Sequence, residues 1–379
     1  MSWLFAILGL GLILLALSDI FFTVLYPRTH KGALSVPVTR GVWWLFQQCA
    51  ANALRHHRDE LLSYSGPTIL VAIVIVWISL LMSGFALIVF PHLGGSIGAT
   101  SGSTPTDFAT ALYYSGYALT TLGTGDIVPK TSFFRLLLIL EAVVGLTSLT
   151  LTLTYFQSVY NALIRRNAFA LSLHHRCAGT ADAAELLSRI GAGNNFENAR
   201  ADIADMANEL QNLLESDHTY PILHYFRFRE HYYALPRMLL LAMDTVTLTA
   251  SALSANKHYS LIHSAAVAEL WGGGMQLLLE LSESFLPKDT PVPREQPVQE
   301  WRVRYYLAAK QLQLAGIETA KDIEAGADVY VSLRWKWGPL VVALAEYLGH
   351  EWSEMASADP NTAIYHLGWE REPESEAGL

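Results

Sequence analysis

The 379 residues of this chain combine an apolar composition with an acidic excess. Hydrophobic residues make up 52% of the sequence, yet the formal net charge is −9 at pH 7. The charge is unevenly placed, because residues 1–164 carry a net charge of +1 and residues 165–379 a net charge of −10. The length predicts about two domains, and the acidic half excludes nucleic acid as a partner.

Three stretches are long enough to cross a bilayer, which takes about 20 apolar residues. Trp3–Tyr26 contains one charged residue, Asp19, and Pro67–Phe90 contains none. Leu136–Ile164 contains only Glu141. We predict that all three are membrane-spanning helices, the first of them an additional amino-terminal span. A signal peptide is the alternative for the first stretch, but it lacks a basic start and a small-residue cleavage site.

The basic residues predict the orientation of these spans. Seven lie between the first two spans or at the end of the third, whereas the loop of residues 91–105 has none. Basic flanks remain in the cytoplasm, so we expect an external amino terminus and a cytoplasmic carboxyl-terminal half. A prokaryotic inner membrane is the expected location. The basic residues are Arg28, Lys31, Arg40, Arg55, Arg58, Arg165 and Arg166.

Two segments outside the spans are expected at the membrane surfaces. Val38–Leu54 contains adjacent tryptophans, which is typical of a helix lying on the inner leaflet. A helix packed on the cytoplasmic domain is the alternative. The Gly/Ser/Thr-rich run Gly94–Thr106 predicts an external loop, and Asp107 or Thr106 is suited to cap a short helix after it.

The heptapeptide at residues 120–126, TTLGTGD, predicts an ion filter. Inward-pointing carbonyls require alternating residues of unusual backbone conformation, which Gly123 and Gly125 reach without a Cβ penalty. Carbonyls of four copies around one axis can then replace the hydration shell of an ion. The predicted ligands are Thr121, Leu122, Gly123 and Thr124. An ordinary glycine-rich turn is the alternative, and the apolar flanks favour the filter.

These flanks resemble the pore domain of the tetrameric potassium channel family. Residues 111–115, ALYYS, match its pore helix, and residues 120–129 match its filter and exit loop. Arg135 begins the inner helix, and Gly145 falls at the hinge position. The resemblance covers Pro67–Tyr160. It implies a homotetramer in the bilayer that conducts monovalent cations, with potassium as the permeant ligand and no other cofactor.

The resemblance has two departures. The family carries Tyr or Phe where this chain has Thr124, and this ring packs behind the filter. The family's frequent pore-helix carboxylate is replaced by Tyr117. We expect Tyr113, Tyr114 and Tyr117 to refill the space behind the filter, with Asp126 supporting its exit. Glu141 could replace the missing carboxylate from the inner helix, or it could form a salt bridge with Arg135 or Lys130.

The inner helix has two stripes. The register of the family places Leu149 and Leu153 nearest the axis and Gln157 at the cytoplasmic mouth, so a ring of leucines could gate by dewetting. The adjacent polar stripe is read as helix packing through hydroxyls, although a pore-lining role is the alternative. It consists of Thr147, Thr150 and Thr154.

The carboxyl-terminal half is predicted to be all-α, from apolar residues at helical spacing. Expected helices are Asp182–Ile190, Glu197–Ser216, Leu235–Ala255, Leu261–Leu286, Val298–Ala315 and Ser332–Gly349. Met238–Ala255 is apolar enough to be considered as a span, but Arg237, Asp244 and its hydroxyls favour a buried bundle helix. A proline-rich linker, residues 286–297, divides this half.

The sequence therefore predicts an all-α polytopic membrane protein. Its parts are a first span (1–26), an interfacial segment (27–66), a pore domain (67–164), a helical cytoplasmic domain (165–369) and an acidic tail (370–379). The sequence contains no combination of a nucleophile and a base that would predict an enzyme. The expected function is a potassium channel that the cytoplasmic domain gates or assembles, with no readable regulatory ligand. Alternatives are a weakly selective Na⁺/K⁺ channel and a non-conducting receptor that reuses the pore fold.

Overall fold

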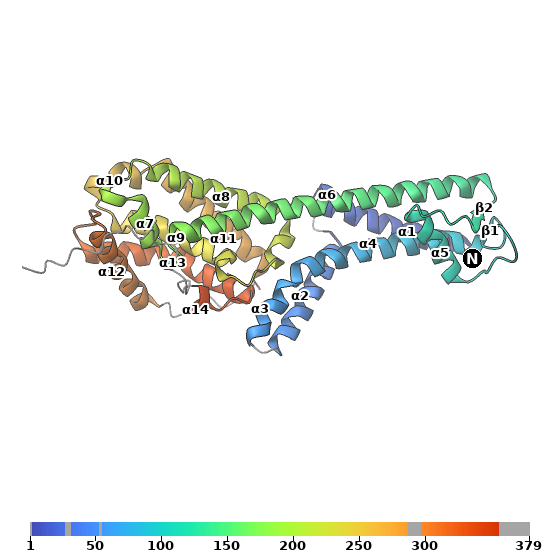
Figure 1. Cartoon of the computed structure of the whole chain (residues 1–379), viewed down its shortest axis with the longest axis horizontal. Helices are drawn as coiled ribbons and strands as arrows, with labels where there is room; N and C mark the ends of the chain where they lie inside the picture. Colours follow the sequence, from blue (N-terminus) through green and yellow to red (C-terminus); the bar gives the residue numbers. More distant parts are fainter. Residues whose placement is uncertain (1, 27–31, 53–54, 287–296, 356–379) are drawn as a thin grey trace, which may run out of the picture. The chain divides into compact units, whose positions relative to one another are not determined.

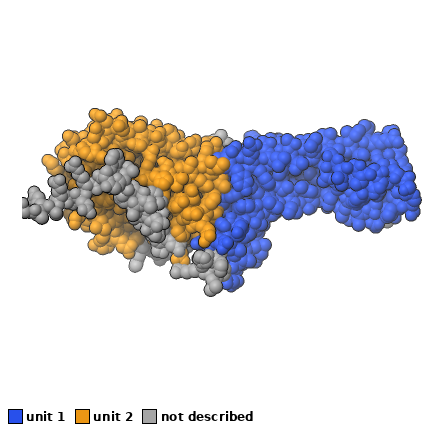
Figure 2. Space-filling view, viewed as in Figure 1, with its two compact units in different colours: residues 1–162, 218–226 blue, residues 163–217, 227–379 orange. Residues whose placement is uncertain are grey.

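The computed structural model is built almost entirely of helices (Figure 1). It describes residues 2–26, 32–52, 55–286 and 297–355. The predicted acidic tail and nearly all of the proline-rich linker lie outside these residues. The chain forms two compact units, residues 1–162 with 218–226 and residues 163–217 with 227–379 (Figure 2).

Unit 1 contains the apolar helices. Three are long and apolar enough to cross a membrane, at Ser2–Leu25, Arg58–His92 and Ser132–Arg176, which agrees with the three predicted spans. The elements of unit 1 are α1 (Ser2–Ile20), the π-helical turn η1 (Phe21–Leu25), α2 (Ser35–Ala51), α3 (Arg55–Ser63), α4 (Ser65–Val89), the short turn η2 (Phe90–His92), α5 (Phe108–Leu119) and most of α6 (Ser132–Arg176).

Helix α1 packs along α4 and is fixed near its carboxyl end by a buried carboxylate. Asp19 accepts hydrogen bonds from Trp77 Nε1 and from the backbone amide of Leu34, both at 2.7 Å, and from the Ser35 hydroxyl. Asp19 is 1% exposed, and burial of a carboxylate is tolerated only with such partners. Asp19 therefore joins α1, α2 and α4.

The loop before α5, predicted to be external, contains a short strand that the sequence analysis did not predict. Strand β1 (Ile97–Ala99) pairs antiparallel with β2 (Ile127–Pro129), with Gly98 opposite Val128. Three residues are too few to show an alternating pattern. The ladder ties the loop before α5 to the segment that follows the predicted filter.

A segment from the middle of the carboxyl-terminal half also belongs to unit 1. Residues 218–226, which include the turn η4 (Pro221–Tyr225), pack on the membrane helices. The Ser65 hydroxyl donates to the Tyr225 carbonyl at 2.8 Å, and the Trp43 and Tyr225 rings lie 5.3 Å apart. The predicted domain of residues 165–369 is therefore not continuous in space, and α6 extends beyond the predicted end at Ile164. Next to Trp43 on α2, Trp44 is 57% exposed, and the place of this helix on the inner leaflet stays a prediction.

Unit 2 is a helical bundle around α9 (Leu235–Ala252), which is buried along nearly all of its length. This position confirms a bundle helix rather than a fourth span. The helix α13 starts at Ile323, nine residues before the predicted Ser332, with Asp322 capping it. The other helices are α7 (Ala183–Ile190), α8 (Ala199–Thr219), α10 (Ala255–Ile262), α11 (Ala265–Phe285), α12 (Val298–Leu314) and α14 (Trp352–Met355), with short turns η3 (Ala192–Asn194) and η5 (His231–Tyr233).

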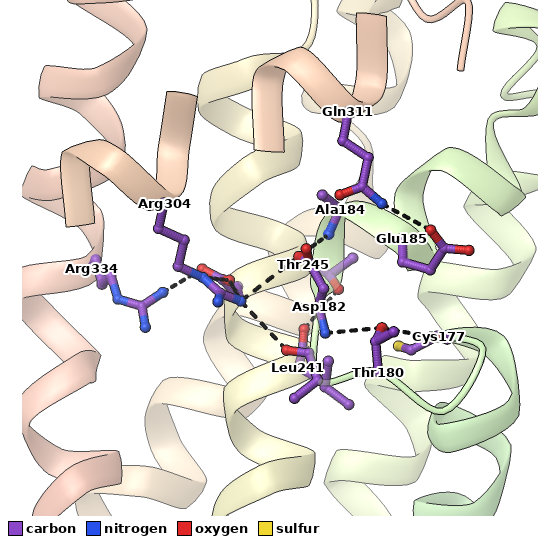
Figure 3. A network of polar contacts seen from close by, with 12 residues as sticks. Cys177, Thr180, Asp182, Ala184, Glu185, Leu241, Thr245, Arg304, Gln311 and Arg334 are labelled. Atoms are coloured by element: carbon purple, nitrogen blue, oxygen red, sulfur yellow. Dashed lines mark hydrogen bonds and ion pairs between the residues drawn. The ribbon is translucent and has the colours of Figure 1, made fainter. Parts of the chain in front are cut away.

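A buried ionic network holds α9, α12 and α13 together (Figure 3). The carboxylate of Asp244 on α9 accepts hydrogen bonds from Arg304 at 2.7 and 2.9 Å and from Arg334 at 2.6 Å. The Tyr330 hydroxyl donates to it at 2.7 Å. Burial favours the neutral acid, but the two guanidinium groups outweigh it and hold the pKa of Asp244 below its usual range. Asp244 is therefore ionised and fully paired.

Candidate ion pore

Helix α5 positions the predicted filter. Asp107 caps its start by accepting a hydrogen bond from the Thr110 amide at 2.8 Å, which confirms the predicted cap. At its end the amides of Thr121 and Leu122 donate to the carbonyls of Ala118 and Tyr117, at 3.1 and 2.9 Å. The first filter residues are thus held on the helix, whose carboxyl end carries the negative end of the helix dipole.

The backbone of the filter segment alternates in conformation. Thr121, Gly123 and Gly125 have φ angles of 56°, 62° and 74°. A left-handed conformation costs about 1 kcal/mol at a residue with a Cβ atom, so its presence at Thr121 shows how strongly the surroundings impose the alternation. This is the pattern that inward-facing carbonyls require.

The filter carbonyls are available to a ligand. Among the residues that the structure describes, none donates a hydrogen bond to the backbone oxygens of residues 121–124. Leu122 is 71% exposed in the single chain. These oxygen atoms therefore accept no hydrogen bond within the described part of the single chain, as the predicted ion ligands require.

A cluster of two hydroxyls and one carboxylate lies at the predicted filter exit, where the potassium channel family has an aromatic ring. Thr124 Oγ1 donates to Asp126 Oδ1 at 2.6 Å, and the Tyr113 hydroxyl lies 3.1 Å from both Thr124 Oγ1 and Asp126 Oδ2. The hydrogen bond from Thr124 lowers the pKa of Asp126. We call these three residues the exit brace. The carbonyl of Asp126 also accepts from the Thr100 amide at 2.9 Å, which links the brace to the external loop.

The other two tyrosines of α5 are buried next to the predicted filter segment. Tyr114 and Tyr117 are buried, with ring centres 5.2 Å apart, and Tyr113 packs edge-on against Tyr117 at 5.5 Å. The Tyr117 hydroxyl donates to the carbonyl of Ile127 in β2. The aromatic side chains in this region therefore belong to α5 and not to the predicted filter segment.

Glu141 points into the same region from α6 and is fully buried. The alternative salt bridge is not formed in the described part of the chain, where Arg135 instead donates to the Pro129 carbonyl at 3.4 Å. One turn later, Gly145 lies against the end of α5, because a Cβ atom at this position would overlap the carbonyl group of Leu119. The helix is unbroken at Gly145, so this glycine is a packing site in addition to a predicted hinge.

The predicted gate residues share one surface of α6. Leu149 and Leu153 are 53% and 60% exposed in the single chain, and Gln157 is exposed as well. In the neighbouring stripe, the hydroxyls of Thr150 and Thr154 donate to the carbonyls four residues earlier, at 2.9 and 3.0 Å. These hydroxyls are satisfied within their own helix, so the exposed leucine face is the surface left for other copies, lipid or a pore.

The sequence analysis missed the partner of the exit brace in the external loop. Thr100 lies in a run of small polar residues, and nothing in that composition distinguishes it from its neighbours. The strand pairing of β1 with β2 is what brings its amide to Asp126. The sequence shows Tyr113 and Asp126 on either side of the predicted filter. Their hydrogen bond could not be predicted, because it depends on the conformations of both side chains.

Comparison with known proteins supports this description of the pore. Residues 70–162 match the family model described as "Ion channel". The uncharacterized membrane protein YdjJ of Bacillus subtilis (strain 168) is 31% identical over 233 residues, which cover 60% of this chain and 64% of that protein. The match thus spans less than two thirds of the relative's length. No solved structure gives a significant match.

These matches confirm the resemblance that the sequence analysis placed at residues 67–160. They also confirm the predicted class, an all-α polytopic membrane protein that carries an ion-channel pore domain. The permeant ion, the number of subunits and the roles of individual filter and gate residues remain predictions.

Proposed function

We propose that this protein is the subunit of a homotetrameric cation channel in which residues 121–125 form the selectivity filter and potassium is the preferred ion. The observation that carries this proposal is the alternating left-handed backbone at Thr121, Gly123 and Gly125, with carbonyl oxygens that accept no hydrogen bond from the described residues. Four such walls around one axis would surround a dehydrated cation with oxygen ligands.

Assembly follows from the same geometry. Within the membrane, polar backbone groups need partners, and the open filter of a single chain has none on its exposed side. A symmetric ring of four copies would place the ion at the common axis. The channel-type pore domain at residues 70–162 supports this arrangement.

A weakly selective Na⁺/K⁺ channel is the second candidate, and the exit brace favours it. Thr124 is held by hydrogen bonds and not by a packed ring. Packing fixes a diameter through contact with many atoms, whereas two or three hydrogen bonds leave more freedom. Selectivity between the two ions then depends on how rigid the brace is.

The role proposed for unit 2 is assembly or gating of the pore. Helix α6 contributes residues up to 162 to unit 1 and its last turns to unit 2 without a break in the helix. Residues 218–226 return to unit 1 from within the bundle. The chain therefore passes between the two units three times, after residues 162, 217 and 226.

The test is ion flux through the purified full-length protein in liposomes, with K⁺ and Na⁺ on opposite sides. We expect K⁺ flux, and its loss in Gly123→Ala, because the positive φ angle strains any residue with a Cβ atom. Gly102→Ala is the matched control, since Gly102 also has a positive φ angle but lies in the external loop. Absence of flux in the wild type would favour the non-conducting receptor.

A further inference from the structure

Residues 220–226, which include the turn η4, contact the inner helix α6 through two aromatic pairs. The ring centres of Tyr220 and Tyr155 are 5.9 Å apart, and those of Phe226 and Tyr160 are 5.8 Å apart. Ring pairs at this separation attract each other beyond the effect of the area that they bury. The segment therefore contacts α6 at two points that are more than one helical turn apart.

The same segment is anchored on α2 and α4. The ring of Tyr225 lies 5.3 Å from that of Trp43, and its carbonyl accepts the hydrogen bond from Ser65. The Phe226 ring lies directly on the backbone of Gly66, because a Cβ atom at this glycine would come within 3.0 Å of three ring carbons. Tyr225 and Phe226 are each 6% exposed. The segment therefore connects α6 to the two helices α2 and α4.

The contacts on α6 follow the predicted gate along the helix. Tyr155 comes two residues after Leu153, and Tyr160 comes seven residues after it. A spacing of seven residues returns to the same face of a helix. Contact between Phe226 and Tyr160 therefore reaches the face of α6 that carries the predicted gate.

A bend of α6 at the predicted hinge would break these contacts. The helix is continuous through Gly145, and Tyr155 and Tyr160 follow this glycine by 10 and 15 residues. At 1.5 Å per residue these positions lie about 15 and 22 Å beyond the hinge. A kink of about 20° would move them by about 5 and 8 Å, which is comparable to the separation of the rings. The contacts therefore belong to the unbent helix.

We propose that residues 220–226 are a latch that holds α6 unbent and keeps the predicted gate closed. A bend at the hinge would carry Leu149 and Leu153 away from the common axis together with the rest of α6. The chain on both sides of the latch belongs to unit 2, so a rearrangement of that unit can withdraw the latch. The effect on the gate rests on the proposed function, whereas the contact of the latch with α6 does not.

The first test weakens the latch with one methyl group. Gly66→Ala places a Cβ atom against the Phe226 ring, whereas the matched control Gly41→Ala, on α2, has no atom within 4 Å of the added carbon. In liposomes that contain the full-length protein, K⁺ flux through Gly66→Ala should exceed that of the control by a factor of about two to ten, the range for loss of one aromatic contact. Hydrogen exchange of residues 150–160 should also be faster than in the control, a readout that needs no conduction.

The second test locks the latch with a disulfide. An added Cβ atom at Gly66 would lie 2.7 Å from Cγ of Phe226. With a carbon–carbon bond of about 1.5 Å, the Cβ atoms of the two positions are at most about 4.2 Å apart, which suits a disulfide. The pair Gly66→Cys and Phe226→Cys, combined with Cys49→Ser to remove an exposed thiol, should therefore form a linked peptide on oxidation, detectable by its mass. Flux should fall below that of the wild type in the oxidised form and rise above it in the reduced form, which lacks the Phe226 ring.

Three results would overturn the proposal. Failure of the disulfide to form would show that the latch does not lie on Gly66. Equal flux and equal hydrogen exchange in Gly66→Ala and Gly41→Ala would show that it does not hold α6. Higher flux in the oxidised form than in the reduced form would show that it favours an open gate. If no form of the protein carries flux, the channel itself is refuted, and the exchange of residues 150–160 still decides whether the latch holds α6.

Discussion

Removal of the Tyr113 hydroxyl tests whether hydrogen bonds hold the filter exit. Tyr113→Phe deletes one oxygen atom and leaves the ring that packs on Tyr117 at 5.5 Å. The hydroxyl lies 3.1 Å from Thr124 and from Asp126, but its single proton can go to only one of them at a time. Because a carboxylate is the stronger acceptor, the bond to Asp126 is the one that the substitution removes.

The magnitude is limited by exposure. Tyr113 is 44% exposed in the single chain, and its bond to Asp126 lies at an exposed site where water competes for both partners. The ratio of braced to unbraced filters should therefore fall by a factor of about two to five. We expect a lower K⁺ over Na⁺ permeability ratio or faster closure of the filter.

Bi-ionic recordings in planar bilayers measure this effect. Tyr64→Phe is the matched control, because Tyr64 is 57% exposed and lies at the start of α4, away from the filter. A second comparison uses Thr124: Thr124→Ser keeps the hydroxyl and should resemble the wild type, whereas Thr124→Val should resemble Tyr113→Phe. If Tyr113→Phe conducts with the permeability ratio and kinetics of Tyr64→Phe, the exit brace does not control the filter.

Four further predictions concern the filter, the gate and unit 2. Thr124→Tyr should raise the K⁺ over Na⁺ permeability ratio in the same recordings by adding a packed ring, unless Tyr117 excludes it. Asp at Leu149 or Leu153 should wet the constriction and raise basal conductance; cysteines there should react with aqueous thiol reagents from the cytoplasmic side. Asp244→Asn should destabilise unit 2 by about 3–5 kcal/mol, because it leaves buried Arg334 unpaired. The control is Asp328→Asn, which alters an exposed ion pair. Asp244→Asn should unfold at a lower temperature than this control. Truncation after Arg166 should change the open probability in bilayer recordings or weaken tetramer assembly as measured by native mass spectrometry. Wild-type behaviour in both measurements would contradict coupling between unit 2 and the pore.

The membrane part of the fold was predictable because it depends on strong local signals. Long apolar runs mark the spans, and Asp107 marks the start of α5 by capping. The backbone of the predicted filter was foreseeable because Gly123 and Gly125 suit the left-handed conformation that they adopt. In unit 2, helical spacing located six helices. It placed the start of α13 too late because Asp322, the actual cap, stands in an exposed charged segment without an apolar stripe.

What the sequence did not reveal depends on contacts between distant residues. Residues 218–226 form only a short turn, so no periodicity connects them to α4, and their place in unit 1 comes from the hydrogen bond of Tyr225 with Ser65. The salt bridge considered for Glu141 was reasonable from spacing alone. It fails because Arg135, one and a half turns away, is directed to the Pro129 carbonyl.

The exit brace suggests how the proposed filter tolerates a threonine. A packed ring resists widening because many weak contacts must break together, whereas the brace relies on the Thr124 hydroxyl, the Tyr113 hydroxyl and one carboxylate. The brace requires ionised Asp126, and its lowered pKa means that the bonds persist at neutral and mildly acidic pH and are lost only as the pH falls through that lowered value. The Asp126 carbonyl also accepts a hydrogen bond from the Thr100 amide, next to the pairing of β1 with β2. This pairing therefore helps to hold Asp126 in place, a role that we assign to the aromatic ring in the potassium channel family. Selectivity in this protein should therefore respond to changes in the external loop as well as in the filter itself.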